Sequence, residues 1–151
     1  MSSGMDLREI KRYQRNFEKC RTNFKDWLAD FLIKEGYKVV DLAKNRTPVK
    51  TGALKARWTV GDQKVKNVIG KDGKFVAQVE QQATRNSLKI AGNIYYVTIS
   101  NGQFYASYVE YGTKKMGGKY MLTRSLDEIR RELPIRFSNE FEAFIKSLGG
   151  A

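Results

Sequence analysis

The sequence predicts an α+β domain with a long N-terminal helix, an antiparallel sheet of three to four strands and a C-terminal helix. In both terminal parts of the chain, apolar residues recur every three or four positions, as they do on one face of a helix. In the middle, apolar and polar residues alternate between glycine-containing turns, as they do in half-buried strands. We expect one domain over residues 6–148. Residues 1–5, which end on a second methionine, are expected to be disordered or an expression remnant.

The first helix is predicted to begin at Leu7 and to extend to about residue 45. Pro48 ends it, because proline disfavours helical geometry in the residue before it. A break is expected near Thr22 and Asn23 or at Gly36, since so long a helix is unusual in a globular protein. The apolar face, which is expected to pack in the core, consists of Leu7, Ile10, Phe17, Cys20, Phe24, Trp27, Leu28, Phe31 and Leu32.

Residues 53–60 alternate after the turn residues Thr51 and Gly52, which predicts a half-buried strand. The outer side of this strand carries Lys55 and Arg57, so we expect that side to be basic. The inward side is apolar and consists of Leu54, Ala56, Trp58 and Val60.

Further along, residues 65–69 and 75–79 flank a glycine-rich turn and are predicted to form a β-hairpin. Residues 81–92 show no clear period, and we expect a loop there. Residues 93–100 alternate again and predict another strand, which the turn residues Asn101-Gly102 end.

The last part of the chain predicts a second long helix that begins near Met121. Pro134 lies inside it and predicts a kink or a restart. Just before this helix, Tyr105, Tyr108 and Tyr111 are spaced so that they occupy successive turns of a short helix. The apolar face of the long helix consists of Leu122, Leu126, Ile129, Leu133, Phe137, Phe141, Phe144, Ile145 and Leu148.

The composition argues against a catalytic protein. The chain has no histidine, which removes the commonest general base and the commonest zinc ligand. Its single cysteine excludes an intramolecular disulfide and any multi-cysteine metal site. The few carboxylates in the middle of the chain are not spaced as an acid–base pair on one element. We therefore expect no enzyme activity, no cofactor and no metal. No apolar run is long enough to predict a transmembrane helix.

The net charge of +12 is concentrated in residues 44–74, which hold nine Lys or Arg residues against two Asp or Glu residues. A clustered basic face attracts phosphate groups or an acidic protein surface, and its binding depends strongly on salt. The alternative is a surface that only keeps the protein soluble. The predicted basic, partner-facing surface consists of Lys50, Lys55, Arg57, Lys64, Lys66 and Lys71.

An aromatic string over residues 105–113 is the second candidate site. Tyrosines provide contact area with little loss of entropy, which favours packing and subunit contact. Alternatively, aromatics beside cations stack single-stranded bases. Glu110 is the one acid in the string. It is either a solvated helix residue or the acceptor of a cation from a neighbouring copy, which would set the register of a ring. The predicted interface residues are Tyr105, Tyr108, Glu110, Tyr111 and Thr113.

Two strings of the sequence resemble signatures of a tailed-bacteriophage neck or tail-completion family of the lambdoid minor tail type. Residues 47–55, Thr-Pro-Val-Lys-Thr-Gly-Ala-Leu-Lys, resemble the first signature, and residues 105–113 resemble the second. Residues 118–126 resemble a third, although its Pro and Phe are absent. The residues that carry the resemblance are Pro48, Thr51, Gly52, Leu54 and Gly112.

The resemblance implies that residues 6–148 are a single neck or tail-completion domain without catalysis. It implies a homo-oligomeric ring, commonly a hexamer, at the head-proximal end of a tail. The partners it implies are the tail terminator or tail tube, neck or connector proteins, and DNA in the lumen, but no membrane. The location would be a virion or a phage-tail-like bacteriocin particle, assembled in the cytoplasm of the host bacterium. From the residues alone, a basic nucleic-acid-binding protein is the alternative.

Overall fold

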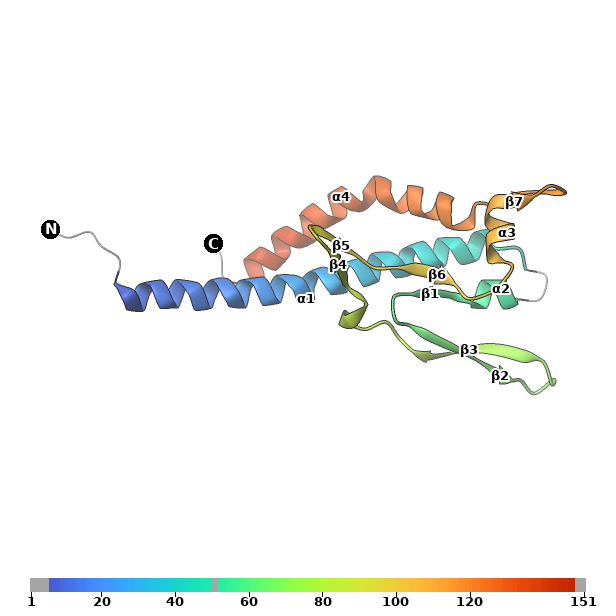
Figure 1. The fold of residues 1–151 in the computed structure, drawn as a ribbon, viewed down its shortest axis with the longest axis horizontal. Helices are drawn as coiled ribbons and strands as arrows, with labels where there is room; N and C mark the ends of the chain where they lie inside the picture. Colours follow the sequence, from blue (N-terminus) through green and yellow to red (C-terminus); the bar gives the residue numbers. More distant parts are fainter. Residues whose placement is uncertain (1–5, 50–51, 149–151) are drawn as a thin grey trace.

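The computed structural model describes residues 6–49 and 52–148. The chain has two long helices, α1 (Leu7–Arg46) and α4 (Met121–Ser147), which run in opposite directions (Figure 1). Helix α4 packs along the C-terminal half of α1. Short strand pairs and two small helices occupy the segment between them. The predicted α+β class, with its long first and last helices, is confirmed. The prediction for residues 1–5 concerns a segment outside the described residues.

Helix α1 is continuous, so the predicted break near Thr22 or at Gly36 is wrong. The Thr22 hydroxyl donates to the Glu18 carbonyl one turn earlier (3.1 Å) instead of capping a new helix. Gly36 is a packing position, because a Cβ there would lie 2.9 Å from a methyl group of Val60. The helix ends at Arg46, just ahead of Pro48, as predicted.

Burial divides α1 into two halves. Its buried residues begin at Leu28, whereas residues 6–22 are all exposed. Figure 1 shows this N-terminal half extending beyond the rest of the molecule. The expectation that Cys20 packs in the core is therefore wrong, since its side chain is exposed. The apolar stripe is present, but α4 ends at Ser147 and covers only the later part of it.

The contact between α1 and α4 is a cluster of six aromatic rings. Trp27 lies at its centre, with ring centroids 5.3 Å from Phe144 and 5.4 Å from Phe137. Helix α4 continues through Pro134, and Figure 1 shows it bending along its length instead of restarting. The remaining rings of the cluster are Phe24, Phe31 and Phe141.

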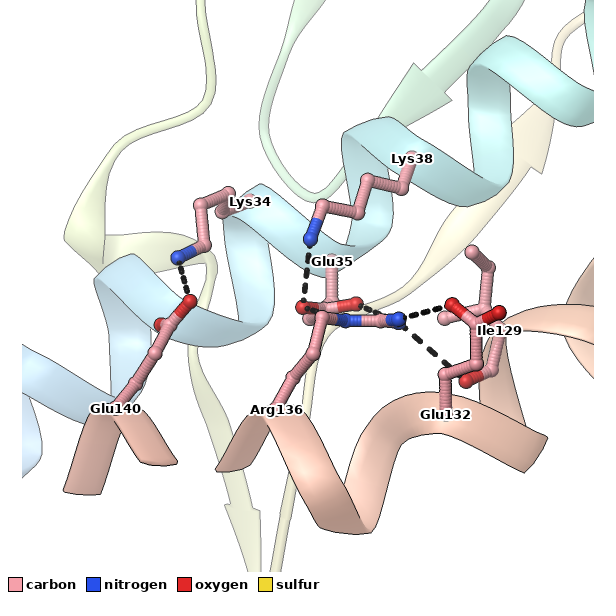
Figure 2. A network of polar contacts seen from close by, with 7 residues as sticks. All are labelled: Lys34, Glu35, Lys38, Ile129, Glu132, Arg136 and Glu140. Atoms are coloured by element: carbon pink, nitrogen blue, oxygen red, sulfur yellow. Dashed lines mark hydrogen bonds and ion pairs between the residues drawn. The ribbon is translucent and has the colours of Figure 1, made fainter. Parts of the chain in front are cut away.

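A buried ion pair fixes the same two helices further along (Figure 2). Arg136 of α4 donates from Nε and Nη2 to the two carboxylate oxygens of Glu35 in α1, at 2.9 and 2.6 Å. Lys38 and Glu132 complete the network. Burial alone would raise the pKa of Glu35, but hydrogen bonds and positive charge from Arg136 and Lys38 outweigh it and lower that pKa. The same hydrogen bonds raise the pKa of Arg136. Both groups are therefore charged at neutral pH.

Within the described residues, the strands form four separate antiparallel pairs instead of one sheet. The predicted hairpin is confirmed as the pair of β2 (Lys64–Ile69) and β3 (Phe75–Gln81). The other pairs are β1 (Trp58–Val60) with β6 (Ile99–Asn101), β4 (Lys89–Ala91) with β5 (Ile94–Tyr96), and β7 (Gly112–Thr113) with β8 (Met116–Gly117).

Three local predictions between the helices need correction. Residues 53–60 are not one strand, because the short helix α2 (Ala53–Ala56) precedes β1. Residues 93–100 are two strands, interrupted where the Thr98 carbonyl accepts a hydrogen bond from the Gly61 amide (2.7 Å). Residues 81–92 are more ordered than a loop, since they contain the 3-10 turn η1 (Arg85–Ser87) and β4.

Asp62 holds η1 in place. Its carboxylate accepts hydrogen bonds from the Thr84 amide (2.8 Å), the Thr84 hydroxyl (2.5 Å) and the Ser87 hydroxyl. Chiefly because of the Ser87 and Thr84 hydrogen bonds, the pKa of Asp62 falls to about 2. Gly61 beside it has a positive φ of 54°, and a Cβ there would collide with the Ser87 side chain.

We expect the Asp62 contacts to be lost in acid. The pKa of Asp62 in the folded protein, about 2, lies below its value in the unfolded chain. The stabilisation that its carboxylate gives to the fold is therefore complete above about pH 4 and disappears as the pH falls toward 2. The protection of the residue 84–88 amides against hydrogen exchange, taken relative to the intrinsic rate at each pH, should therefore fall over this range in wild type. Asp62→Asn should show the reduced protection already at neutral pH. Equal protection in the two proteins at pH 7 would contradict this role.

Candidate functional site

The two strings that the sequence singled out, residues 47–55 and 105–113, meet at one end of the molecule. Leu54 and Trp58 belong to the buried core, and Tyr105 and Val109 pack against that core from the second string. Figure 1 shows α2, α3 (Ala106–Tyr111) and β7 together at this end, where α4 begins. Segments about fifty residues apart in sequence thus form one surface.

An apolar cavity of about 270 Å³ lies where these strings meet. This volume is just below the range of roughly 300–1,000 Å³ that is usual for small-molecule sites, and most of the lining is apolar. It fits a group the size of a protein side chain better than a charged cofactor. The lining residues are Pro48, Gly52, Leu54, Tyr105, Val109, Met116 and Lys119.

Hydrogen bonds to the core position the first string. The Thr47 hydroxyl donates to the Ala43 carbonyl (2.6 Å) and accepts from the Trp58 indole N–H (2.9 Å). The Asn101 side-chain amide donates to the Leu54 carbonyl (2.8 Å). Gly52 has a positive φ of 77° and begins α2. These contacts hold Pro48, Gly52 and Leu54 at the cavity; Lys50 and Thr51 lie outside the described residues.

The second string forms helix α3, so the helical spacing predicted for its tyrosines is confirmed. Tyr105 is partly buried and lines the cavity, whereas Tyr108 and Tyr111 are 58% and 70% exposed. Phe104 beside them is 87% exposed. Phe104 is not among the predicted interface residues, although it directly precedes the string. Three exposed aromatic side chains thus belong to, or directly precede, the string that lines the apolar cavity.

Glu110 is not a solvated helix residue, because it is only 6% exposed. Its carboxylate accepts hydrogen bonds from the backbone amides of Leu122 (2.9 and 3.0 Å) and Thr123 (2.9 Å), in the first turn of α4. It therefore occupies the place of an N-terminal cap, which the N-cap residue Tyr120 cannot provide with its own side chain. Pairing of Glu110 with a neighbouring copy stays a prediction, and any such pair would share a carboxylate that already accepts these bonds.

The loop from α3 to α4 folds back on itself through close backbone contacts. Gly112 has a φ of 87°, and a Cβ there would lie 2.6 Å from the Gly118 amide nitrogen. The Lys119 and Tyr120 amides donate to the carbonyls of Val109 (2.8 Å) and Glu110 (3.0 Å). A Cβ at Gly118 would likewise lie 2.6 Å from the Glu110 carbonyl oxygen. Gly112 and Gly118 are thus both required on steric grounds, and only Gly112 was among the predicted signature residues. Thr113, in the same loop, is exposed.

The predicted basic residues lie in two different settings. Lys64, Lys66 and Lys71 are exposed on the β2–β3 hairpin, whereas Lys55 and Arg57 are partly buried at α2. The expected basic outer face of a strand at residues 53–60 is wrong, because Lys55 lies in a helix and Arg57 caps its end. Arg57 and Lys64 share one groove, which Glu80 also lines.

Within residues 6–49 and 52–148, no group of three or more His, Cys, Asp or Glu side chains could hold a metal ion. None of the helices in these ranges combines the length and the apolar character that crossing a membrane requires.

A family model with the description "Bacteriophage HK97-gp10, putative tail-component" matches residues 11–112 of the chain. The match includes the first string completely and the second string up to Gly112. No curated protein and no solved structure matches the chain.

Proposed function

This chain belongs to the HK97-gp10-like family of bacteriophage tail components, and we propose that it forms a homo-oligomeric ring at the head-proximal end of the tail. In this proposal the ring joins tail parts during assembly and carries out no reaction. Its partners are further copies of the chain, with six in a ring, together with the tail terminator or tail tube and the neck or connector proteins. Its place is the virion or a phage-tail-like particle.

The observation that carries the proposal is the surface around the cavity. Phe104, Tyr108 and Tyr111 are exposed in or next to the string whose Tyr105 and Val109 line it, and Met116, which also lines it, is 50% exposed. Aromatic residues and methionine are enriched in the centres of protein interfaces, where an anchor residue of one partner fills a pocket of the other. We infer that this end of the molecule docks on another protein.

The small core supports the same proposal. Among the described residues, more large hydrophobic side chains are exposed than are buried. A closed ring also needs two unlike patches on each copy, so that one patch meets the other around the circle. The end of the molecule that carries Phe104, Tyr108 and Tyr111, here called the aromatic end, provides one candidate patch. The β2–β3 hairpin, with exposed Lys64, Lys66 and Lys71, provides a second that differs in charge.

The aromatic end gives the proposal its test. We expect the double variant Tyr108→Ala/Tyr111→Ala to fold, since both side chains are exposed, but to join tails about tenfold less well. The measurement is a count of completed particles by electron microscopy after adding purified protein to tails made without it. The matched control is Tyr95→Ala/Tyr96→Ala, which removes two exposed tyrosines from β5. Full joining by the Tyr108/Tyr111 variant would overturn the proposal.

A nucleic-acid-binding protein is the second candidate function, favoured by the exposed lysines of the hairpin. Lys64, Lys66, Lys71 and Lys74 are all exposed there. If they bind phosphates, each Lys→Gln change should reduce the slope of log affinity against log salt by about one. Tight, salt-sensitive DNA binding by a monomer would favour this candidate. Binding only by the assembled ring would instead fit DNA passing through its lumen.

A further inference from the structure

The cavity between the two strings carries charge of one sign only. Among its described lining residues, Lys119 is the single charged one. Residues 47–57 and 105–120, which include all of the lining residues, hold six Lys or Arg residues against one acid, Glu110. That acid is buried and accepts hydrogen bonds from the first turn of α4, so it is already occupied within the chain. The apolar cavity thus lies in a cationic part of the molecule.

The Lys119 ammonium is available to a partner. The residue is exposed, and within the described residues no ion pair involves its side chain. Its backbone is fixed, because its amide donates to the Val109 carbonyl (2.8 Å). Lys114 and Lys115, in the same loop, are exposed as well. A fixed, unpaired cation on the lining attracts a partner that brings a carboxylate.

The size and the lining of the cavity fit one large apolar side chain. Its volume is about 270 Å³, and the polar side-chain groups of its described lining are the Lys119 ammonium and the Tyr105 hydroxyl. A small metabolite is usually oriented by several precisely placed polar groups, which this lining does not offer. An apolar anchor residue that fills a pocket is instead typical of the centre of a protein interface.

We propose that the cavity receives a leucine or phenylalanine side chain of a tail or neck protein, next to an Asp or Glu whose carboxylate pairs with Lys119. The inference rests on the proposed function, in which this end of the molecule docks on another protein. A second copy of the chain fits less well, because its net charge of +12 opposes a cationic surface. DNA brings negative charge, but its phosphates are polar and leave the apolar lining uncovered.

The anchor and the ion pair are expected to contribute unequally. The walls of the cavity are held by hydrogen bonds within the chain, so little ordering is needed on binding. Burial of a leucine or phenylalanine side chain is worth about tenfold or more in affinity. The ion pair with Lys119 is exposed and is worth about fivefold or less. Filling the cavity should therefore weaken docking more than removing the charge does.

The first test fills the cavity from within. Val109→Phe should reduce the joining of tails at least about tenfold, because its ring takes the place of the anchor. Val97→Phe is the matched control, since Val97 is also partly buried against the core but does not line the cavity. Should Val109→Phe not fold, Met116→Trp fills the cavity from a residue that is 50% exposed. Wild-type joining by either folded variant overturns the inference and leaves the proposed function standing.

The second test concerns the charge of the partner. Lys119→Gln should reduce joining by about fivefold or less, and Lys119→Glu should reduce it further, since it repels the carboxylate of the partner. Lys89→Glu in β4 is the control, because it makes the same change of charge at an exposed lysine outside the lining. Unchanged joining by Lys119→Glu overturns the acidic partner. A lower oligomer mass of Val109→Phe in light scattering would put a second copy in the cavity and also overturn the inference.

The third test needs no tails and so separates the cavity from the proposed function. Indole serves as the probe, because apolar cavities that are already formed bind small aromatic molecules. In an NMR titration it should shift the amide signals of Leu54 and Tyr105 in wild type but not in Val109→Phe. No shift in wild type overturns the cavity as a binding site, even if the protein joins tails. Wild type that binds indole but joins no tails overturns the proposed function and, with it, the tail or neck protein as the partner.

Discussion

Arg136→Ala should destabilise the protein by about 3–5 kcal/mol, the largest loss that we expect from a single polar change. The substitution removes both hydrogen bonds that Glu35 accepts from Arg136, at 2.6 and 2.9 Å. The Glu35 side chain is only 5% exposed, so its charge would remain buried with Lys38 as the nearest cation. Removing one partner of a buried ion pair leaves an unpaired buried charge, which is strongly destabilising. Replacing both partners by apolar residues of similar size costs much less stability.

The measurement is the free energy of unfolding from urea titrations at pH 7. Arg85→Ala is a matched control, because Arg85 also donates two hydrogen bonds to one carboxylate, that of Asp30, but the pair is exposed. Its loss should cost much less stability than the loss of Arg136, because exposed ion pairs are screened by solvent. The double variant Glu35→Gln/Arg136→Met should recover most of the stability that Arg136→Ala loses. Equal effects of Arg136→Ala and Arg85→Ala would contradict a special role of burial.

The same reasoning gives a pH dependence. The pKa of Glu35 in the folded protein lies below its ordinary value. Its ion pair therefore stabilises the fold in full when the pH is above the pKa of the unfolded chain. This stabilisation is lost as the pH falls through the pKa of the folded state. The difference in stability between wild type and Arg136→Ala should therefore narrow on acidification below about pH 4.

The two long helices could be predicted from the sequence, because their periodic pattern runs over many turns. Short segments were harder, since tertiary contacts decide them. The alternation at residues 53–60 fits a strand, yet Gly52 with a positive φ begins a helical turn that places Leu54 in the core. Gly36 suggested a helix break, but the close approach of Val60 requires a glycine inside a continuous helix.

The candidate site was predicted in part. Both strings were identified, and the structure brings them together around one cavity. Their meeting could not be predicted, because no local pattern records a contact between residues about fifty positions apart. Cys20 was predicted to be buried but is exposed, again because a tertiary contact decides its burial. Its place on the apolar face of the helix was visible, but whether that face is covered depends on where α4 ends.

The role of Glu110 was likewise hidden from the sequence, because its hydrogen-bond partners lie twelve and thirteen residues further along. We expect Glu110→Gln to lower the free energy of unfolding by about 1.5–3 kcal/mol, since hydrogen bonds to a charged acceptor are replaced by weaker ones. The lost charge also faces the positive end of the α4 dipole. Glu142→Gln in the same helix removes an exposed charge paired with Lys146 and should cost about 0.5 kcal/mol or less.

The concentration at which Glu110→Gln is measured decides between its two possible roles. A cation from a neighbouring copy can contribute only when copies are assembled, whereas the cap of α4 acts within one chain. We expect the loss of stability to be present in full at dilutions where light scattering gives the mass of a monomer. A loss that appears only at concentrations where the protein assembles would instead show that the carboxylate acts between subunits.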